Sequence, residues 1–277
     1  MPQISFAEQY GPWAIVAGAS DGVGRAFAET LASRGLNVVL LARRRETLND
    51  VSSSIERQYK VQTRVIAMDL ATTDAAARLM AEVNDLEIGF FVYCAGADSN
   101  FKPFLSSPLE VAESMLHRNC NVLMQLSHHL CGPMATRGRG ATVILGSGAG
   151  FSGTQNMVAY AATKAFDMVF AEALWCELKP KGVNVLGLIL GETDTPSLRK
   201  LRYERGLSKS TDEPVKGAET PQYVVDDALA HLEKGPIRLA NKMMRVGLRF
   251  LYPFSRNFVV GLMAKASEKI MGKDIAQ

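Results

Sequence analysis

Short apolar runs alternate with segments of helical periodicity along most of this chain. The apolar runs favour strands at 13–18, 37–42, 63–68, 88–94, 141–147 and 183–190, with a candidate seventh strand at 235–240. Apolar residues at helical spacing favour helices near 23–34, 45–58, 73–84, 109–136, 157–178 and 221–233. This alternation predicts an α/β protein with a doubly wound parallel sheet of six to seven strands, covered by helices on both faces. We expect it to form a single domain over residues 1–240.

Two segments interrupt the alternation. Residues 194–220 contain prolines, glycines and many charges, which predicts a mobile insertion that serves as a substrate lid. The first half of this insertion is basic, so it could meet the phosphates of a CoA thioester or simply form a solvated helix face. Residues 241–277 mix apolar and basic side chains and predict a helical amphipathic extension. That extension could pack on the body or a partner subunit, cover the substrate pocket, or contact a membrane surface.

Composition and charge exclude several classes of protein. With 277 residues, 47% apolar and 21% charged, the chain is typical of a globular protein. A net charge of +3 gives no reason to expect nucleic-acid binding. Neither a signal peptide nor a run of about 18 apolar residues, long enough to span a membrane, is evident. We therefore expect a cytoplasmic protein without a transmembrane segment, assembled as a homodimer or homotetramer.

The cysteines and histidines give no metal-binding pattern. The cysteines are scattered without a Cys-x-x-Cys pair, so we expect reduced, buried thiols at Cys94, Cys120, Cys131 and Cys176. The histidines lack ligand spacing as well; they stand at His117, His128, His129 and His231. We expect no metal site.

A glycine-rich segment near the start of the chain indicates a phosphate-binding turn. Gly18, Gly22 and Gly24 follow the apolar run Trp13–Ala17 and precede a helical pattern. Glycines at such a strand-to-helix turn permit a tight backbone and the close approach of phosphate oxygens, which the N–H groups of the helix N-terminus then bind. The alternative is a glycine-rich turn between two packed elements.

Tyr160 and Lys164 stand four residues apart and therefore share one face of a helix. A neighbouring ammonium favours the phenolate over the phenol, which makes a tyrosine useful as an acid or base near neutral pH. Taken alone, the pair could be a coincidence on an exposed helix face. Together with the glycine segment, it predicts proton transfer beside a phosphorylated cofactor.

Across roughly residues 10–235, these features resemble the short-chain dehydrogenase/reductase family. The resemblance implies a Rossmann-like fold and adds Ser147 and Asn119 to the catalytic set. The segments most similar to the branch with 3-ketoacyl-CoA reductases and 17β-hydroxysteroid dehydrogenases are Tyr10–Ala14, Arg34–Leu40 and Val158–Ala165. Eukaryotic members of that branch usually carry membrane segments, so their absence here indicates a soluble relative from a bacterial cytosol.

The family binds a nicotinamide dinucleotide, and the end of the second strand indicates which one. The position where NAD-using relatives place aspartate is Ala42, and Arg43 follows it. An always-charged guanidinium suits a 2′-phosphate, so NADP(H) is favoured and NAD(H) remains possible. Arg44 and Arg45 could begin a solvated helix. The resemblance implies cofactor-binding roles for Gly18, Ser20, Asp21, Gly22, Val23, Gly24, Arg43, Asp69, Leu70, Ala95, Gly96, Tyr160, Lys164, Gly191, Thr193 and Thr195.

The chain departs from the family pattern in two places. Tyr93-Cys94 replaces the usual Asn-Asn before Ala95-Gly96, and Leu190-Gly191 replaces the usual Pro-Gly. We expect the fold to survive both changes.

These features predict an NADP(H)-dependent oxidoreductase that interconverts a lipophilic ketone and a secondary alcohol, with Tyr160 as general acid and base. Apolar residues beside the catalytic segments fit a lipophilic pocket or ordinary core: Phe151, Met157, Val158 and Leu198. One alternative is a non-catalytic dinucleotide-binding sensor or scaffold on the same fold; another is a lipid enzyme held at a membrane by its tail. A steroid, a 3-oxoacyl thioester and an aryl ketone all remain open as substrates.

Overall fold

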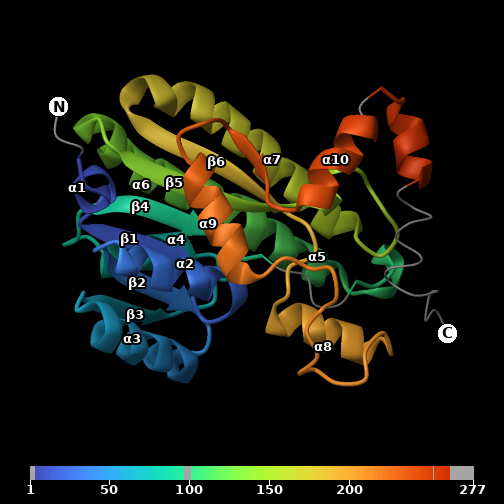
Figure 1. Cartoon of the computed structure of the whole chain (residues 1–277), viewed down its shortest axis with the longest axis horizontal. Coiled ribbons are helices and arrows are strands. Elements are labelled where there is room, and N and C mark those ends of the chain that lie inside the picture. Colours follow the sequence, from blue (N-terminus) through green and yellow to red (C-terminus); the bar gives the residue numbers. More distant parts are fainter. Residues whose placement is uncertain (1–3, 97–100, 252, 263–277) are drawn as a thin grey trace.

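A seven-stranded, all-parallel sheet forms the centre of the molecule, with the strand order β3-β2-β1-β4-β5-β6-β7 (Figure 1). The computed structural model describes residues 4–96, 101–251 and 253–262. The strands are β1 Trp13–Ala17, β2 Asn37–Ala42, β3 Thr63–Ala67, β4 Ile88–Tyr93, β5 Gly140–Ser147, β6 Val183–Leu190 and β7 Ile237–Leu239. The predicted α/β class and parallel sheet are thus confirmed, including the seventh strand.

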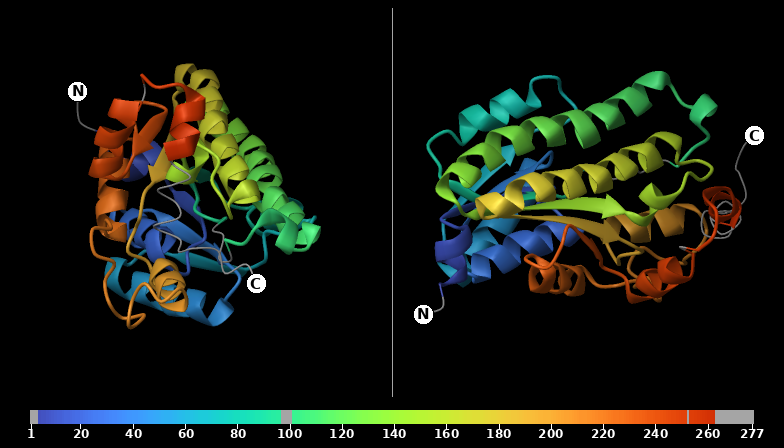
Figure 2. Two further views of the ribbon diagram at one scale, coloured as in Figure 1. Left: turned by 90° about the vertical axis from the view of Figure 1, so that its right-hand side faces the viewer. Right: turned by 90° about the horizontal axis from the view of Figure 1, so that it is seen from above.

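Helices cover both faces of the sheet, as the view from above shows (Figure 2). One face carries α1 Phe6–Tyr10, α2 Gly22–Ser33, α3 Arg45–Tyr59 and α9 Pro221–His231. The other carries α4 Ala75–Glu82, α6 Leu123–Arg137 and α7 Val158–Leu178. Successive side chains of β1 enter opposite cores, Val16 toward the first group of helices and Ile15 toward the second. A strand buried on both faces reads as a continuous apolar run, which explains why the sequence pattern located the strands.

The helix expected near 109–136 is divided in the structure. It consists of α5 Leu109–Leu116, a π-helical turn η2 His117–Val122, and α6. Such π-turns are rare and occur frequently at functional sites. Here the turn carries the buried Asn119. Three short 3₁₀ segments complete the central region: η1 Phe104–Ser106, η3 Gly148–Phe151 and η4 Lys179–Lys181.

The insertion after β6 contains a helix, α8 Pro196–Glu204, tied to the body at its base. Thr195 caps it by accepting a hydrogen bond from the Leu198 N–H (3.2 Å). The Arg199 guanidinium grips the Asp194 carboxylate with bonds of 2.6 and 2.7 Å, and Asp194 also accepts from the Val215 N–H (3.1 Å). These contacts join the two ends of the insertion; its expected mobility stays a prediction.

The C-terminal extension is helical as far as the structure describes it. Helix α10 spans Lys242–Leu251, and residues 256–262 form a further helical segment. The remainder of the expected extension, 263–277, lies outside the described residues. The inner side of α10 covers the loop after β5, since a Cβ added at Gly148 would lie 3.0 Å from Met244 Sδ. Within the described ranges, no helix is long and apolar enough to cross a bilayer.

All four cysteines are free. Cys120 and Cys131 are buried as expected and Cys94 is half-buried, but Cys176 is exposed on α7, which corrects the expectation for that residue.

Candidate active site

The turn between β1 and α2 has the geometry that a dinucleotide phosphate requires. Gly18 has a φ of +88°, and a Cβ added there would lie 2.7 Å from the Cys94 carbonyl oxygen. A Cβ at Gly24 would overlap the carbonyl oxygen of Gly18. Asp21, at the N-cap of α2, makes no side-chain bond to the helix, so the first N–H groups of α2 are not used by a cap. The residues present therefore fit a bound pyrophosphate.

Two arginines follow β2, and their side chains lie in different surroundings. Arg43 is exposed, and its side chain forms no hydrogen bond or ion pair with the described residues. Arg44 reaches the glycine turn, with its Nη2 atom 3.5 Å from Ser20 Oγ and 3.8 Å from Asp21 Oδ2. Arg44 was expected only to begin a helix. The structure instead brings it beside the turn, so both arginines are candidates for a 2′-phosphate contact.

The other expected cofactor residues follow the carboxyl ends of β3 and β4. Asp69 Oδ1 accepts a hydrogen bond from the Ala71 N–H (2.9 Å), so this carboxylate closes a turn. The Leu70 side chain is buried in the core, which leaves its backbone to meet a ligand. Gly96 has a φ of +116°, and a Cβ there would overlap the Asn119 amide. Glycine is therefore required at this position.

After β6, the loop with Gly191, Thr193 and Thr195 approaches the glycine turn. Thr193 Oγ1 donates to the Gly191 carbonyl oxygen (3.3 Å). A Cβ added at Gly22 would lie 2.9 Å from Thr195 Cγ2, so these two loops meet. The carboxyl ends of parallel strands flank the crevice in which such folds bind ligands.

The proposed catalytic residues come from β5, η2 and α7. Ser147 ends β5, and its Oγ accepts a hydrogen bond from the Ala149 N–H (3.2 Å). Tyr160 and Lys164 lie in the first turns of α7, with Lys164 Nζ 5.9 Å from the centroid of the tyrosine ring. Lys164 Nζ also donates to the Leu145 carbonyl oxygen (2.9 Å), two residues before Ser147. This bond places the start of α7 against the end of β5.

Asn119 is fully buried and connects these elements. Its Nδ2 atom donates to Thr163 Oγ1 (2.9 Å) and to the Gly96 carbonyl oxygen (3.3 Å). Its Oδ1 atom accepts from Arg118 Nε (3.2 Å). Thr163 Oγ1 in turn donates to the Tyr160 carbonyl oxygen (2.9 Å). The amide thus fixes η2, the loop after β4 and α7 relative to one another.

Lys164 carries its charge inside the protein. Burial disfavours the ammonium, but the Asp167 carboxylate, 2.8 Å away, acts with Tyr160 in the opposite direction, and the pKa of Lys164 is raised above its usual value. Burial also raises the pKa of Asp167, with Lys164 opposing the change. Burial raises the pKa of the neighbouring Cys94 thiol to about 12, so it stays neutral at physiological pH.

Sequence reasoning overlooked Thr163 and Asp167, although a signal for both was present. Tyr160, Thr163, Lys164 and Asp167 follow the i, i+3, i+4, i+7 spacing of one helix face. Polar residues on that face indicate a buried polar network when the face turns toward a sheet.

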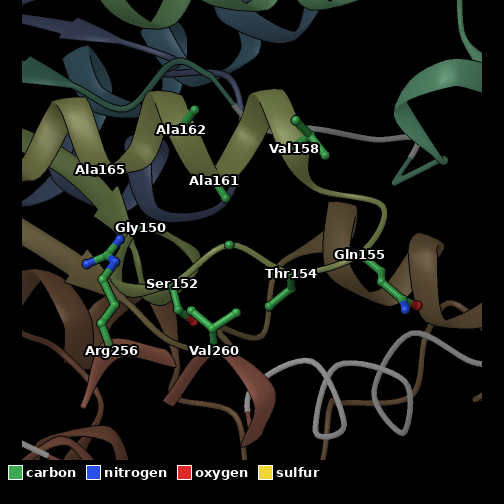
Figure 3. A pocket seen from close by; sticks show the side chains of 11 residues that line it. Gly150, Ser152, Thr154, Gln155, Val158, Ala161, Ala162, Ala165, Arg256 and Val260 are labelled. Carbon is green, nitrogen blue, oxygen red and sulfur yellow. The ribbon is translucent and has the colours of Figure 1, made fainter. Parts of the chain in front are cut away.

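A cavity of about 560 Å³ lies behind this site, between the loop after η3, the first turns of α7 and the segment 256–262 (Figure 3). Ala161, Ala162 and Ala165 line it from α7, and Val158 is the one expected pocket residue among its lining. None of the proposed catalytic residues lines this cavity, so it lies along a side of α7 other than the one that carries Tyr160 and Lys164. The described residues contain no cluster of three or more His, Cys, Asp or Glu side chains suited to a metal ion.

Comparison with known proteins assigns the family. The sequence profile described as short chain dehydrogenase matches residues 12–206. The chain belongs to the short-chain dehydrogenase family. A 7β-hydroxysteroid dehydrogenase of Mediterraneibacter gnavus is 34% identical over 236 residues, which cover 83% of this chain and 86% of that protein. The 17β-hydroxysteroid dehydrogenase type 3 of Rattus norvegicus is 33% identical over 236 residues, covering 82% and 76%.

A solved structure agrees with the sequence relatives. The structure from a study of 7β-hydroxysteroid dehydrogenase stereoselectivity superimposes with a TM-score of 0.84 at 31% identity, covering 93% of this chain and 98% of that one. The expected resemblance to the hydroxysteroid dehydrogenase branch is thereby confirmed. As a short-chain dehydrogenase, the protein is an oxidoreductase of hydroxyl or ketone substrates that uses NAD(H) or NADP(H). This assignment speaks against a non-catalytic sensor or scaffold.

Proposed function

We propose that this short-chain dehydrogenase interconverts a steroid-like ketone and its secondary alcohol with NADP(H), using Tyr160 as general acid and base. One observation carries the proposal. Lys164 is held as a buried cation on the same helix face as Tyr160 and is bonded to β5 beside Ser147. A tyrosine next to a fixed positive charge is suited to exchange a proton near neutral pH.

The side chains of the site divide the work of reduction among them. The nicotinamide supplies the hydride when it is bound. As negative charge develops on the carbonyl oxygen of the substrate, the hydroxyl of Ser147 donates a hydrogen bond to it and Tyr160 transfers its proton. Groups oriented before the reaction stabilise the transition state more than the ground state. In the reverse direction the Tyr160 phenolate accepts the proton.

Asn119 and Lys164 support this exchange. Asn119, through Thr163 and Gly96, fixes the position of α7. Lys164 favours the phenolate electrostatically and is the candidate ribose contact. Ser147, Tyr160, Lys164 and Asn119 therefore form the proposed catalytic set.

The preference for NADP(H) rests on the mouth of the cofactor crevice. Ala42 offers no carboxylate to the ribose hydroxyls, while Arg43 and Arg44 supply two guanidinium groups, one of them beside Ser20. A 2′-phosphate is favoured by such a pair of cations, whereas the ribose of NAD gains little from it.

The charge state of the insertion favours a neutral substrate over a CoA thioester. Three of its six basic side chains are paired with acids: Arg199 with Asp194, Arg202 with Glu192 at 3.2 Å, and Lys200 with Glu204 at 3.7 Å. CoA phosphates would have to compete with these carboxylates. A steroid-like ketone requires no such exchange, and steroid substrates are named for the two relatives above.

Exposed apolar side chains support a homodimer or homotetramer. They occur on the outer sides of α5, α6 and α7, at Leu116, Met124 and Val169. Apolar surface gathered on neighbouring helices is typical of a subunit interface.

The outward face of α10 supports peripheral contact with an anionic membrane. Met243 and Phe250 are 80% and 72% exposed, with Val246 between them. The exposed Lys242 and Arg249 flank these residues, and the sequence from 241 to 267 contains no aspartate or glutamate. An apolar helix face flanked only by cations binds anionic lipid headgroups through both charge and apolar burial.

An assay that monitors the nicotinamide tests the catalytic proposal. Steroid ketones, aryl ketones and a 3-oxoacyl-CoA thioester are offered with NADPH or NADH at low and high salt. At saturating NADPH, we expect turnover of a steroid ketone and little effect of salt, because exposed charges do not hold the substrate. Turnover confined to the CoA thioester and lost at high salt would assign the other substrate class. Absence of turnover by folded protein that binds NADPH would contradict the activity itself.

A further inference from the structure

Asp167 is a buried carboxylate for which the reaction has so far supplied no role. It lies on α7 one turn after Lys164 and is 2% exposed. Its Oδ2 atom accepts the 2.8 Å hydrogen bond from Lys164 Nζ. Its Oδ1 atom is buried and has no hydrogen-bond partner among the described residues.

This arrangement is a poor device for stabilising a fold. Removing a carboxylate from water is costly, and the cost is recovered only when both oxygens are well bonded. Asp227 on α9 shows the structural alternative, because Arg238 grips both of its oxygens at 2.6 and 2.7 Å and Arg245 adds a contact at 3.4 Å. Asp167, by contrast, is bonded to one cation through Oδ2, and its Oδ1 atom accepts no hydrogen bond from the described residues.

Asp167 is needed to keep Lys164 protonated. A lysine that is 5% exposed tends to lose its proton, because burial penalises the ammonium. Four other titratable groups lie near the pair: Tyr93 at the end of β4, Cys94 directly after it, Cys120 on η2, and Tyr160 on α7. The Tyr93 hydroxyl donates a hydrogen bond to the carbonyl oxygen of Arg118. Burial raises the pKa of Tyr93, and raises that of Cys120 to about 11, so both are neutral at physiological pH. Asp167 is thus the anion that faces the Lys164 ammonium.

We infer that Asp167 is a positioning residue for the proton exchange. Its carboxylate keeps Lys164 charged inside the protein and, with the Leu145 carbonyl oxygen, fixes the direction in which Nζ acts on Tyr160. The inference rests on the proposed role of Tyr160 as acid and base, and extends it to a residue on the far side of the lysine.

Removing the charge of Asp167 should therefore change the ionisation of Lys164 and, through it, that of Tyr160. Asp167→Asn keeps the side-chain shape but removes the charge, so the pKa of Lys164 falls; an opposite charge at this distance is worth about 1–3 pH units. The lysine then loses its proton at lower pH, and the phenolate of Tyr160 loses its stabilising cation. The ionisation midpoint of Tyr160 therefore moves to higher pH in the variant. If Lys164 stayed charged without Asp167, removal of a nearby anion would move the midpoint to lower pH.

A tyrosinate absorbance titration of the full chain without cofactor measures this midpoint. Each protein is compared with the same protein carrying Tyr160→Phe, so that the difference spectrum isolates one of the seven tyrosines. The readout requires neither substrate nor turnover, so it can fail or succeed independently of the proposed function. The pH profile of kcat/KM for alcohol oxidation is then expected to rise at higher pH in Asp167→Asn, by the same shift.

Three variants complete the experiment. Asp227→Asn, the matched control, is expected to lower Tm while leaving the Tyr160 midpoint unchanged. In a Lys164→Met background, Asp167→Asn is expected to cause no further shift to higher pH, because that shift acts through the lysine and the lysine is gone. Asp167→Glu keeps the charge and is expected to hold the Tyr160 midpoint near that of the wild type while lowering kcat. If Asp167→Asn does not fold, the midpoint of Asp167→Glu tests the inference in its place. An unchanged or lower midpoint in Asp167→Asn, a further shift to higher pH in the Lys164→Met background, or a midpoint in Asp167→Glu well above that of the wild type would each overturn the inference.

Discussion

The side-chain amide of Asn119 donates a hydrogen bond of 2.9 Å to Thr163 Oγ1, which joins the π-helical turn η2 to α7 one residue before Lys164. Both partners are buried, and Thr163 passes the connection on to the Tyr160 carbonyl oxygen. The two halves of the proposed catalytic set are therefore positioned by a bond between a residue that the family pattern names and one that it does not.

Thr163→Val should impair both stability and turnover. The substitution keeps the shape of the side chain but removes the acceptor, leaving the buried amide of Asn119 unsatisfied on one side. Such a loss costs about 1–3 kcal/mol of stability. We expect a lower Tm together with a lower kcat, measured by thermal melting and steady-state kinetics. Thr142→Val, which removes another buried hydroxyl on β5, is the matched control and should lower Tm without lowering kcat to the same degree. Equal losses of kcat in Thr163→Val and Thr142→Val would contradict a specific role of Thr163 in positioning the catalytic residues.

Tyr160→Phe should abolish nearly all turnover while leaving cofactor affinity close to normal. Only the proton donor is lost, and one positioned acid contributes about 10²–10⁴-fold to the rate. The measurements are kcat for ketone reduction and NADPH binding followed by fluorescence. Tyr203→Phe changes an exposed tyrosine on α8 in the same way and should keep full activity. If Tyr160→Phe retained a third of its activity, Tyr160 could not be the acid.

Removing the arginines after β2 should weaken NADPH more than NADH. A hydrogen bond to a charged group is worth about 1.5–3 kcal/mol, or roughly ten- to a hundredfold in affinity. We expect Arg43→Ala and Arg44→Ala each to raise the Kd of NADPH selectively, and the larger of the two effects identifies the principal phosphate contact. Arg45→Ala, at the first residue of α3, is the control and should leave both affinities unchanged. Equal losses for NADPH and NADH in both variants would contradict the preference for NADP(H).

Substitutions on the outward face of α10 should reduce binding to anionic vesicles. Met243→Ser and Phe250→Ser together remove two large exposed apolar side chains without touching the inner face that carries Met244. We expect the wild type to co-sediment with phosphatidylserine-containing vesicles in a salt-sensitive manner, and the double variant to do so much less. Leu105→Ser removes an exposed leucine from η1 and should leave vesicle binding unchanged. Absence of vesicle binding by the wild type, with dissociation of the oligomer in the double variant, would identify this face as a subunit contact.

The sequence by itself determined the parallel sheet, the succession of strands and helices along the chain, and the chemistry expected at Tyr160 and Lys164. These features depend on local patterns: strands buried on both faces are continuous apolar runs, and residues at i and i+4 share a helix face. The glycine turn was readable for the same reason, since Gly18 stands where a positive φ and a close carbonyl oxygen leave no room for a side chain.

Only the tertiary structure decided the contacts between residues distant in sequence. Arg44 meets Ser20 across 24 positions, and Asn119 meets Thr163 across 44; the pairing of these side chains depends on which loops the sheet brings together. The helical pattern at 109–136 concealed a π-turn because apolar periodicity does not record a single extra residue in a turn. The acids that pair with Arg199 and Arg202 of the insertion, and the burial of Asp167 beside Lys164, likewise depend on which elements the fold brings together. The charge of a side chain is visible in the sequence, whereas its ion-pair partner and its exposure to solvent are properties of the fold.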